Sequence, residues 1–376
     1  MKYSDVRIED IFVARYGKSL PKLKRKEGNV KVYGSGGVIG YHNKALVEGP
    51  AIILGRKGNI GRVFYEEDEF FPIDTTYYIE EDSSYDLKFI YYLLQTLNLE
   101  KLNTHSAVPG LNRENLYSLN VSIPDKSKQI AIGKILTLFD SKIELNNDIV
   151  DTIEEIISAI FKRWFKDFEF PDSDKKPYRT NSGEFIESEF GQIPIGWKIS
   201  ELSQLIKIKS GKRPENTRKK YNSEYSIPVV GATKIIGYTN EALVEGSIIT
   251  TGRVGTHGCI RRYDQPIWIS DNAFYIRSEY EEYIYQVMKY IDYYSLNRGS
   301  TQPLISQNDL KKYPMLLPPI GIIKDYEERV SLLSKEIDTY KKENMTLNFI
   351  KATIMPKLIS GEIELPSYDK AIAFNY

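Results

Sequence analysis

The chain has 376 residues with 41% hydrophobic and 27% charged side chains, so its length exceeds what one hydrophobic core usually supports and two domains are expected. Its formal net charge of zero excludes attraction of nucleic acid by the overall field, and an anionic partner has to be held by local clusters. No apolar run suggests a membrane span, the single Cys259 excludes an internal disulfide, and the acidic N-terminal stretch is unlike a secretory signal, so we expect a cytoplasmic protein.

The first predicted domain covers residues 1–125 and mixes strands with helix. Short apolar runs such as residues 51–54 are punctuated by Gly, Pro and Asn, which is typical of strands, and residues 87–97 have a helical pattern. Beyond residue 125 the apolar residues recur at steps of three and four, which predicts a long helix over residues 126–167. Its apolar stripe is Leu136, Phe139, Ile143, Asn146, Val150, Ile153, Ile156, Ile160 and Trp164.

The same order of elements follows a second time. A polar linker is predicted over residues 168–193, a second mixed domain over 194–318, a second long helix over 319–358 and a C-terminal tail over 359–376. The stripe of the second helix is Val330, Leu333, Ile337, Tyr340, Asn344, Leu347, Ile350, Ile354 and Leu358.

This order reflects an internal duplication. The pentapeptide ALVEG occurs at residues 45–49 and 242–246, an offset of 242 − 45 = 197, and it lies within a longer ungapped match of residues 40–61 to 237–258. Upstream, Gly17-Lys18 matches Gly211-Lys212 at 211 − 17 = 194, and the offset returns to 194 downstream. A period this long is far above that of solenoid repeats and indicates two complete copies of one domain. We therefore predict a mixed α/β (α+β) fold with two duplicated domains, each followed by a long helix.

The two predicted helices are expected to pair with each other as an antiparallel coiled coil. A helix of about 40 residues is about 60 Å long, longer than a small domain, so much of it needs a partner helix for burial. Asn146 and Asn344 lie near the centres of the two stripes, where a buried polar residue can fix the register. The alternative, that both asparagines face solvent, stays open at this point.

Catalytic motifs are poorly represented. His42, His105 and His257 lie at no metal-ligand spacing from one another or from Cys259. The glycines at 55, 58 and 61, and their copies at 252, 255 and 258, match neither dinucleotide nor P-loop patterns and indicate tight turns. Residues 171–176 superficially resemble an acidic-lysine nuclease motif but belong to the linker, and no Asn-Pro-Pro-aromatic methyltransferase motif occurs. We predict no catalytic residue and no metal ligand.

Basic residues, in contrast, recur at equivalent positions of the two copies. Lys24-Arg25-Lys26 matches Arg218-Lys219-Lys220 at the 194 offset, and Arg56 matches Arg253. A single charge run is usually a solvated face, but recurrence in two copies favours contacts to phosphate, while the nearby Arg, Asn and Gln that differ between the copies are suited to base edges. The predicted DNA-binding residues are Lys18, Lys24, Arg25, Lys26, Arg56, Lys57, Asn59, Arg62, His105, Asn112 and Arg113 in the first copy, and Lys212, Arg213, Arg218, Lys219, Lys220, Arg253, Thr256, His257, Arg261, Arg298, Gln302 and Gln307 in the second.

The order of several short motifs resembles the specificity subunits of type I restriction-modification systems. IPDKSKQIAIGKILTLFDSKI resembles the entry to that family's first conserved helix, KRWFKDFEF its exit and SEFGQIPIGW the entry to the second domain; LPP and KLISGEI also match. The resemblance covers essentially the whole chain. The first copy lacks the Ile-Pro-x-Gly-Trp segment that precedes the second copy at Ile193–Trp197, which affects only the expected start of the first domain.

The resemblance implies a non-catalytic DNA reader with two target-recognition domains, each reading one half of an asymmetric bipartite site in double-stranded DNA. It further implies two modification (methyltransferase) subunits docked on the helices, and restriction subunits for translocation and cleavage. S-adenosylmethionine, ATP and Mg would be bound by those partners and none by this chain. Two alternatives are an adaptor whose helices bind protein without DNA, and a degenerate methyltransferase fused to its recognition domains. Salt-dependent binding to duplex DNA would separate the first interpretation from both.

Overall fold

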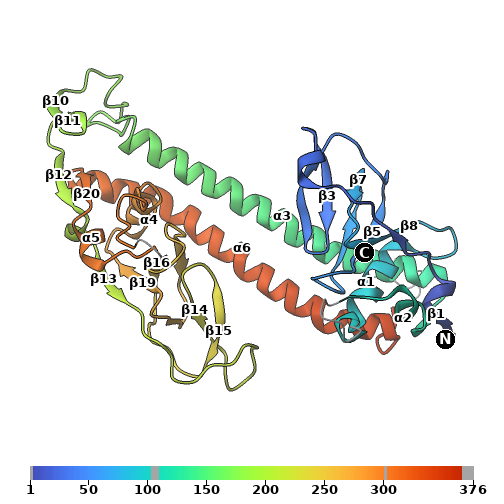
Figure 1. Cartoon of the computed structure of the whole chain (residues 1–376). Helices are drawn as coiled ribbons and strands as arrows, with labels where there is room; N and C mark the ends of the chain where they lie inside the picture. Colours follow the sequence, from blue (N-terminus) through green and yellow to red (C-terminus); the bar gives the residue numbers. More distant parts are fainter. Residues whose placement is uncertain (1–2, 103–109, 300–302, 366–376) are drawn as a thin grey trace, which may run out of the picture. The chain divides into compact units, whose positions relative to one another are not determined.

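The computed structural model describes residues 3–102, 110–299 and 303–365 (Figure 1). The chain divides into two compact units, the first made of Met1–Asp148 with Tyr340–Tyr376 and the second of Ile149–Thr339. This division passes through the two long helices, α3 (Lys126–Phe165) and α6 (Ile320–Ser360). Each unit therefore contains one mixed α/β domain and part of each long helix.

The domain of the first unit contains three small sheets. A four-stranded antiparallel sheet has the order β2-β8-β5-β6, a three-stranded sheet has the order β4-β3-β7 with β3 and β7 parallel, and β1 pairs with β9. The elements are β1 (Ser4–Arg7), η1 (Ile8–Asp10), β2 (Arg15–Tyr16), η2 (Lys22–Lys24), β3 (Val30–Gly34), β4 (Gly37–His42), β5 (Ala51–Gly55), β6 (Val63–Glu66), β7 (Phe70–Pro72), β8 (Thr76–Glu80), α1 (Leu87–Thr96), η3 (Leu99–Leu102), α2 (Arg113–Tyr117) and β9 (Asn120–Ile123).

The domain of the second unit repeats this topology, with the sheets β13-β19-β16-β17, β15-β14-β18 and β12-β20. Its elements are β12 (Lys198–Glu201), η4 (Leu202–Gln204), β13 (Lys207–Ser210), β14 (Ile227–Val230), β15 (Ile235–Thr239), β16 (Ile248–Gly252), β17 (Arg261–Tyr263), β18 (Trp268–Ile269), β19 (Ala273–Arg277), α4 (Glu281–Lys289), α5 (Gln307–Lys311) and β20 (Pro314–Leu317). The strand registers are also copied, because Gly55 opposes Thr76 in one unit and Gly252 opposes Ala273 in the other. The predicted duplication is confirmed down to the pairing of single residues.

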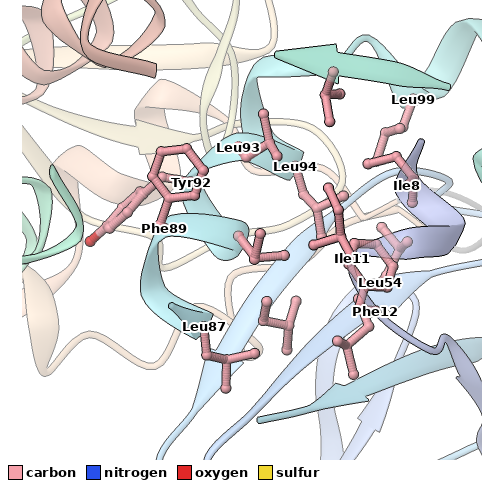
Figure 2. Packing of buried hydrophobic residues seen from close by; sticks show 14 of the residues in the cluster. Ile8, Ile11, Phe12, Leu54, Leu87, Phe89, Tyr92, Leu93, Leu94 and Leu99 are labelled. Atoms are coloured by element: carbon pink, nitrogen blue, oxygen red, sulfur yellow. The ribbon is translucent and has the colours of Figure 1, made fainter. Parts of the chain in front are cut away.

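The core of the first unit lies between α1, the β5 strand and the long helices. The run Ala51–Gly55 is buried throughout, which explains why β5 is apolar on both of its faces. Figure 2 shows α1 side chains such as Phe89 and Leu94 gathered with Ile11 and Leu54. Leu358 of α6 belongs to the same cluster, so the domain and the end of α6 share one core.

Within the first unit, α3 and α6 pack antiparallel. Asp140 forms an ion pair with Lys351 at 2.5 Å, and Asn146 forms a hydrogen bond with Asn344 at 2.8 Å. Residue numbers therefore increase along α3 in the direction in which they decrease along α6. Both asparagines are buried, as the coiled-coil interpretation predicts. The solvent-facing alternative for them is wrong.

Within the second unit, the other parts of α3 and α6 meet through aromatic side chains. The Tyr326 ring lies 6.0 Å from both the Phe161 and Trp164 rings, measured between centroids. The predicted stripes are wrong at two points. Ile350 of the first unit is 38% exposed, and Ile156 is 44% exposed whereas Ile157 and Phe161 are buried. The buried positions continue from Ile153 by two steps of four, so the adjacent Ile157 takes the place assigned to Ile156.

The segment predicted as a polar linker is structured. It forms a hairpin of β10 (Phe185–Ser188) and β11 (Gly191–Pro194). Phe170 is buried, and its ring lies 4.6 Å from Tyr178 and 5.5 Å from Trp197. An aromatic cluster therefore joins this segment to the second domain.

Tyr3 and the residues that follow α6 up to Leu365 pack within the first unit. Tyr3, which the 194 offset aligns with Trp197, donates to the Leu358 carbonyl at 3.4 Å. In the predicted tail, Ile359 belongs to the buried core and Leu365 packs against it. Across the described ranges, no helix has both the length and the hydrophobicity needed to span a bilayer.

Candidate nucleic-acid interface

The repeated glycines form a tight turn after the central strand of each domain. Gly58 and Gly61 have φ of 78° and 72°, and their copies Gly255 and Gly258 have 82° and 72°, a region that favours glycine. A Cβ on Gly55 would lie 2.2 Å from the Asn59 carbonyl oxygen, so the turn closes only around glycine. The expectation of tight turns is confirmed.

Each turn begins with an arginine in the same setting. Arg56 Nη1 donates to the Asp74 carbonyl at 3.2 Å, and its Cζ lies 5.6 Å from the Tyr77 ring centroid. In the second domain Arg253 Nη1 contacts the Asp271 carbonyl at 3.4 Å, and its Cζ lies 5.9 Å from the Phe274 ring. We name Arg56 and Arg253 the constant arginines.

Two further positions contact each other in both domains and differ in residue type between them. In the first domain, Arg56 Cζ and Arg113 Cζ lie 4.8 Å and 5.0 Å from the Tyr16 ring centroid. The equivalents of Tyr16 and Arg113 at the 194 offset are Ser210 and Gln307, and Gln307 Nε2 donates to Ser210 Oγ at 2.7 Å. A side-chain contact between these two positions is thus retained while its chemistry changes. We call Tyr16–Arg113 and Ser210–Gln307 the variable pairs.

One member of each variable pair lies at the start of a short helix. Arg113 and Gln307 are the first residues of α2 and α5. Asn112 Oδ1 accepts from the Glu114 N–H and Ser306 Oγ from the Asp309 N–H, so each helix starts behind a capping side chain. The predicted DNA contact Asn112 is therefore also a helix cap.

Tyr16 of the first variable pair packs against the buried Tyr77. The rings of Tyr16 and Tyr77 lie 5.0 Å apart, and Tyr16 is 45% exposed. Burial raises the pKa of Tyr77 to about 12, so its hydroxyl stays protonated and donates to the Leu111 carbonyl at 3.0 Å. That bond ties β8 to the loop that leads into α2.

The basic loops are only partly free. Lys24, Lys26, Lys219 and Lys220 are exposed, but Arg25 is half-buried and donates to the Ile39 carbonyl at 2.7 Å. Arg218 exchanges backbone hydrogen bonds with Tyr238 at 2.8 Å and places its Cζ 4.8 Å from the Tyr225 ring. In both loops, the exposed lysines are the groups best placed to meet a phosphate.

Several other predicted residues are exposed, namely Lys18, Lys57, Asn59, Arg62, Lys212, Arg213, Thr256 and Arg261. Arg298 forms an ion pair with Asp309 of α5. His257 Nδ1 lies 3.4 Å from the Gly252 carbonyl oxygen and its Nε2 is buried, so in this conformation neither nitrogen reaches a base. His105 and Gln302 lie outside the described residues.

Sequence reasoning missed Tyr16 and Ser210. Both precede the Gly-Lys dipeptide that the two copies share, Gly17-Lys18 and Gly211-Lys212. The signal that could have found them was this position, where an aromatic residue aligns with a small polar one directly beside unchanged residues.

The acidic-lysine segment has a local structural role. Asp172 Oδ1 accepts from the backbone N–H of Asp174 and of Lys176, each at 2.9 Å. Its Oδ2 accepts from Asn181 Nδ2 at 2.7 Å. These bonds fold the loop and engage both oxygens of the carboxylate that the nuclease interpretation would assign to a metal.

Comparison with known proteins agrees with this architecture. The family described as "Type I restriction modification DNA specificity domain" matches residues 2–155 and 194–351, one match for each copy. Among curated relatives, the type I restriction enzyme MjaIX specificity subunit of Methanocaldococcus jannaschii is 23% identical, covering 74% of this chain and 69% of its own. The HindI specificity subunit of Haemophilus influenzae is 22% identical, covering 86% and 88%.

A solved structure shares the fold over nearly the full length. The crystal structure of the type I restriction-modification S subunit from M. genitalium has 18% identity and a TM-score of 0.60, covering 97% of both chains. With the family match over most of the sequence, the chain belongs to the type I restriction-modification specificity subunits.

Proposed function

We propose that this chain is the non-catalytic DNA-reading subunit of a type I complex, and that each domain reads one half of an asymmetric bipartite site. The observation that carries this is that both domains keep an arginine in the same turn while a contacting side-chain pair, Tyr16–Arg113 or Ser210–Gln307, changes its chemistry. A common scaffold with different side chains at one contact position is what two readers of different short sequences require. The division into domains at residues 1–125 and 194–318 belongs to the same proposal.

The long helices are proposed to dock two modification subunits. Leu138 and Ile350 of the first unit are 69% and 38% exposed and lie within one turn of the Asp140–Lys351 pair. Their equivalents at the 194 offset, Leu332 and Ile156, are 67% and 44% exposed in the second unit. Exposed apolar pairs that recur in both copies suit two identical partners, one for each copy.

Catalysis and cofactors are assigned to the partners. S-adenosylmethionine would be bound by the modification subunits, and ATP and Mg by the restriction subunits, while this chain supplies double-stranded DNA recognition. This assignment is independent of which base is methylated.

A domain exchange tests the function. Residues 1–125 are replaced by the corresponding domain of a relative, and the methylated motif is read by sequencing the methylome of cells that also contain the modification subunit. One half of the motif should change while the other half stays the same. If both halves change together, or methylation loses its sequence dependence, two separate readers are excluded. An adaptor without DNA contact would instead leave methylation independent of this chain.

The docking proposal has its own test. Leu138→Arg and Leu332→Arg should each remove one modification subunit from the purified complex, measured by native mass spectrometry. The exposed Leu23→Arg variant in the first basic loop is a control that should retain both subunits. Full retention of both partners by Leu138→Arg and Leu332→Arg would place the docking surface elsewhere.

A further inference from the structure

We propose that the variable pairs determine one base pair in each half-site, with Arg113 reading a G·C pair and Gln307 reading an A·T pair. Tyr16 and Ser210 act as positioning residues for these two side chains. The inference rests on the proposed function and adds to it the residues and the chemical identity of one base pair in each half.

The side chains of Arg113 and Gln307 extend from equivalent positions of the backbone in the two domains. Arg113 and Gln307 each open a short helix behind a capping residue, and the preceding segments bond the glycine turns alike, Leu111 N–H to the Arg56 carbonyl at 2.8 Å and Ile305 N–H to the Arg253 carbonyl at 3.0 Å. Side chains from one backbone site on two copies of a scaffold meet the equivalent position of each half-site. A difference in the base read there then follows from side-chain chemistry alone.

Arg113 has the geometry of a guanine reader. Its Cζ lies over the Tyr16 ring at 5.0 Å and 5.8 Å from the Tyr117 ring, so aromatic faces support the guanidinium. Stacking uses the face of the guanidinium and leaves N–H groups along its edge. Two of these groups can donate to O6 and N7 of guanine, the commonest specific contact in the major groove. Arg113 is half-buried, which limits the conformations that compete with the reading one.

Gln307 has the hydrogen-bond donor and acceptor that match the major-groove edge of adenine. Its Nε2 spends one N–H on Ser210 Oγ, which fixes the plane of the amide. The second N–H of Nε2 and the lone pairs of Oε1 remain, and they match N7 and the N6 amino group of adenine. Because Ser210 Oγ accepts from this amide, loss of Ser210 should reduce discrimination at the same base pair that Gln307 reads.

The constant arginines share a backbone carbonyl and an aromatic ring in the two domains, so the difference between the half-sites is assigned to the variable pairs. Arg253, for which no contact to a variable pair is seen among the described residues, provides the control. Arg253→Ala should lower methylation at all sites alike and leave the preferred sequence unchanged.

The test is methylome sequencing of cells that carry the complete modification complex with single variants of this chain. Arg113→Lys should relax one G·C pair in one half-site, and Gln307→Ala one A·T pair in the other. Discrimination at that pair should fall roughly ten- to a hundredfold, the range for one bidentate contact. The double variant Tyr16→Ser with Arg113→Gln copies the second domain, so it is compatible with the scaffold and should convert the G·C preference into A·T.

The outcomes separate this inference from the proposed function. A wild-type chain that supports no bipartite motif refutes the function itself. A normal wild-type motif that the Arg113→Lys and double variants leave intact, or that relaxes at an A·T pair with Arg113→Lys, refutes only the assignment of bases. A uniform loss of methylation by Arg113→Lys, with an unchanged unfolding midpoint, would identify a phosphate contact and equally overturn it.

The positioning role of Ser210 is tested by Ser210→Ala, which should relax the same A·T pair as Gln307→Ala but less strongly. Ser203→Ala removes another half-buried serine of the same domain, which contacts Glu201, and should leave the motif unchanged. Relaxation at a different base pair, or none, would show that Ser210 does not act through Gln307.

Discussion

Asn146 Nδ2 donates to Asn344 Oδ1 at 2.8 Å, and the two side chains are 0% and 9% exposed. Their remaining groups are also bonded, since Lys142 Nζ donates to Asn146 Oδ1 and Asn344 Nδ2 to Asn147 Oδ1, each at 2.9 Å. The coiled coil therefore contains one satisfied polar layer. Shifting either helix by a turn would bury these amides against aliphatic side chains, so the layer fixes the register.

The first prediction concerns this layer. Asn146→Val should lower the free energy of unfolding by about 1–3 kcal/mol, because it leaves a buried amide of Asn344 without its partner. Asn146→Val combined with Asn344→Leu should recover most of that loss. Urea unfolding of the single and double variants gives the coupling energy. Strictly additive losses would mean that the two amides do not depend on each other.

Long periodic elements could be predicted from the sequence, but the burial of single side chains and contacts between distant segments could not. The 40-residue stripe forecasts α3 because a helical period repeated that often has few competing structures. Ile156 and Ile157 are identical neighbours in the sequence, and only the packing of the folded chain decides that Ile157 is the buried one. The sequence of residues 168–193 predicts a linker because its aromatic residues follow no period, and they contact partners such as Trp197 only in the folded chain.

The candidate site shows the same limit. Repetition identified Arg56 and Arg253, because a charge kept in two copies stands out. Tyr16 carries no such signal, since it aligns with a serine and has no charge, and its role depends on the approach of Arg56 and Arg113 from two other loops. That approach is a property of the fold and leaves no local pattern.

The second prediction uses a difference in helix capping between the copies. Asp86 Oδ1 accepts from the Phe89 N–H at 2.7 Å and caps α1. Gly133 of α3 lies against it, and a Cβ there would be 2.7 Å from the same oxygen. At the equivalent positions, Tyr280 provides no side-chain cap, and Glu327 of α6 accepts from the Tyr283 N–H at 2.8 Å. Each helix is capped by one carboxylate. In the first copy it belongs to the residue before α1, and in the second copy it belongs to the long helix α6.

Gly133→Ala should therefore lower the free energy of unfolding by about 1–3 kcal/mol, although alanine normally favours a helix over glycine. Gly321→Ala, on α6, is the matched control. No atom lies within 4 Å of the Cβ it would introduce, so it should be neutral or slightly stabilising. Equal unfolding midpoints for the two variants would contradict the clash with Asp86.

The third prediction concerns Glu327. Burial raises its pKa to about 7, with a further contribution from Glu282, while hydrogen bonds from the Tyr283 and Glu282 N–H groups and the charge of Arg262 oppose the shift. A carboxyl whose pKa is raised by folding favours the native state when protonated. Its contribution is complete below the ordinary value of 4.5 and is lost as the pH rises to about 7.

Glu327→Gln, which stays neutral, should remove this loss. The free energy of unfolding of the variant minus that of the wild type should rise between pH 4.5 and 7 by about 1–3 kcal/mol, allowing for solvent screening. Parallel profiles over this range, from denaturant unfolding at each pH, would mean that Glu327 is ionised at no cost. Glu328→Gln, an exposed neighbour on the same helix, should give a flat difference.

The last prediction concerns the basic loops of the proposed DNA interface. Lys24 and Lys26 are exposed, whereas Arg25 bonds the Ile39 carbonyl, so reversing only the two lysines spares the fold. Lys24→Glu with Lys26→Glu should weaken duplex binding by the complex at all sequences and lower the salt slope by about 2, one for each lost phosphate contact. Binding is measured by fluorescence anisotropy over a range of salt concentrations, with the exposed Lys175→Glu as a control that keeps the slope. An unchanged slope with an altered sequence preference would assign these lysines to bases. Because the loops are duplicated, the same reversal at Lys219 and Lys220 should have an effect of similar size.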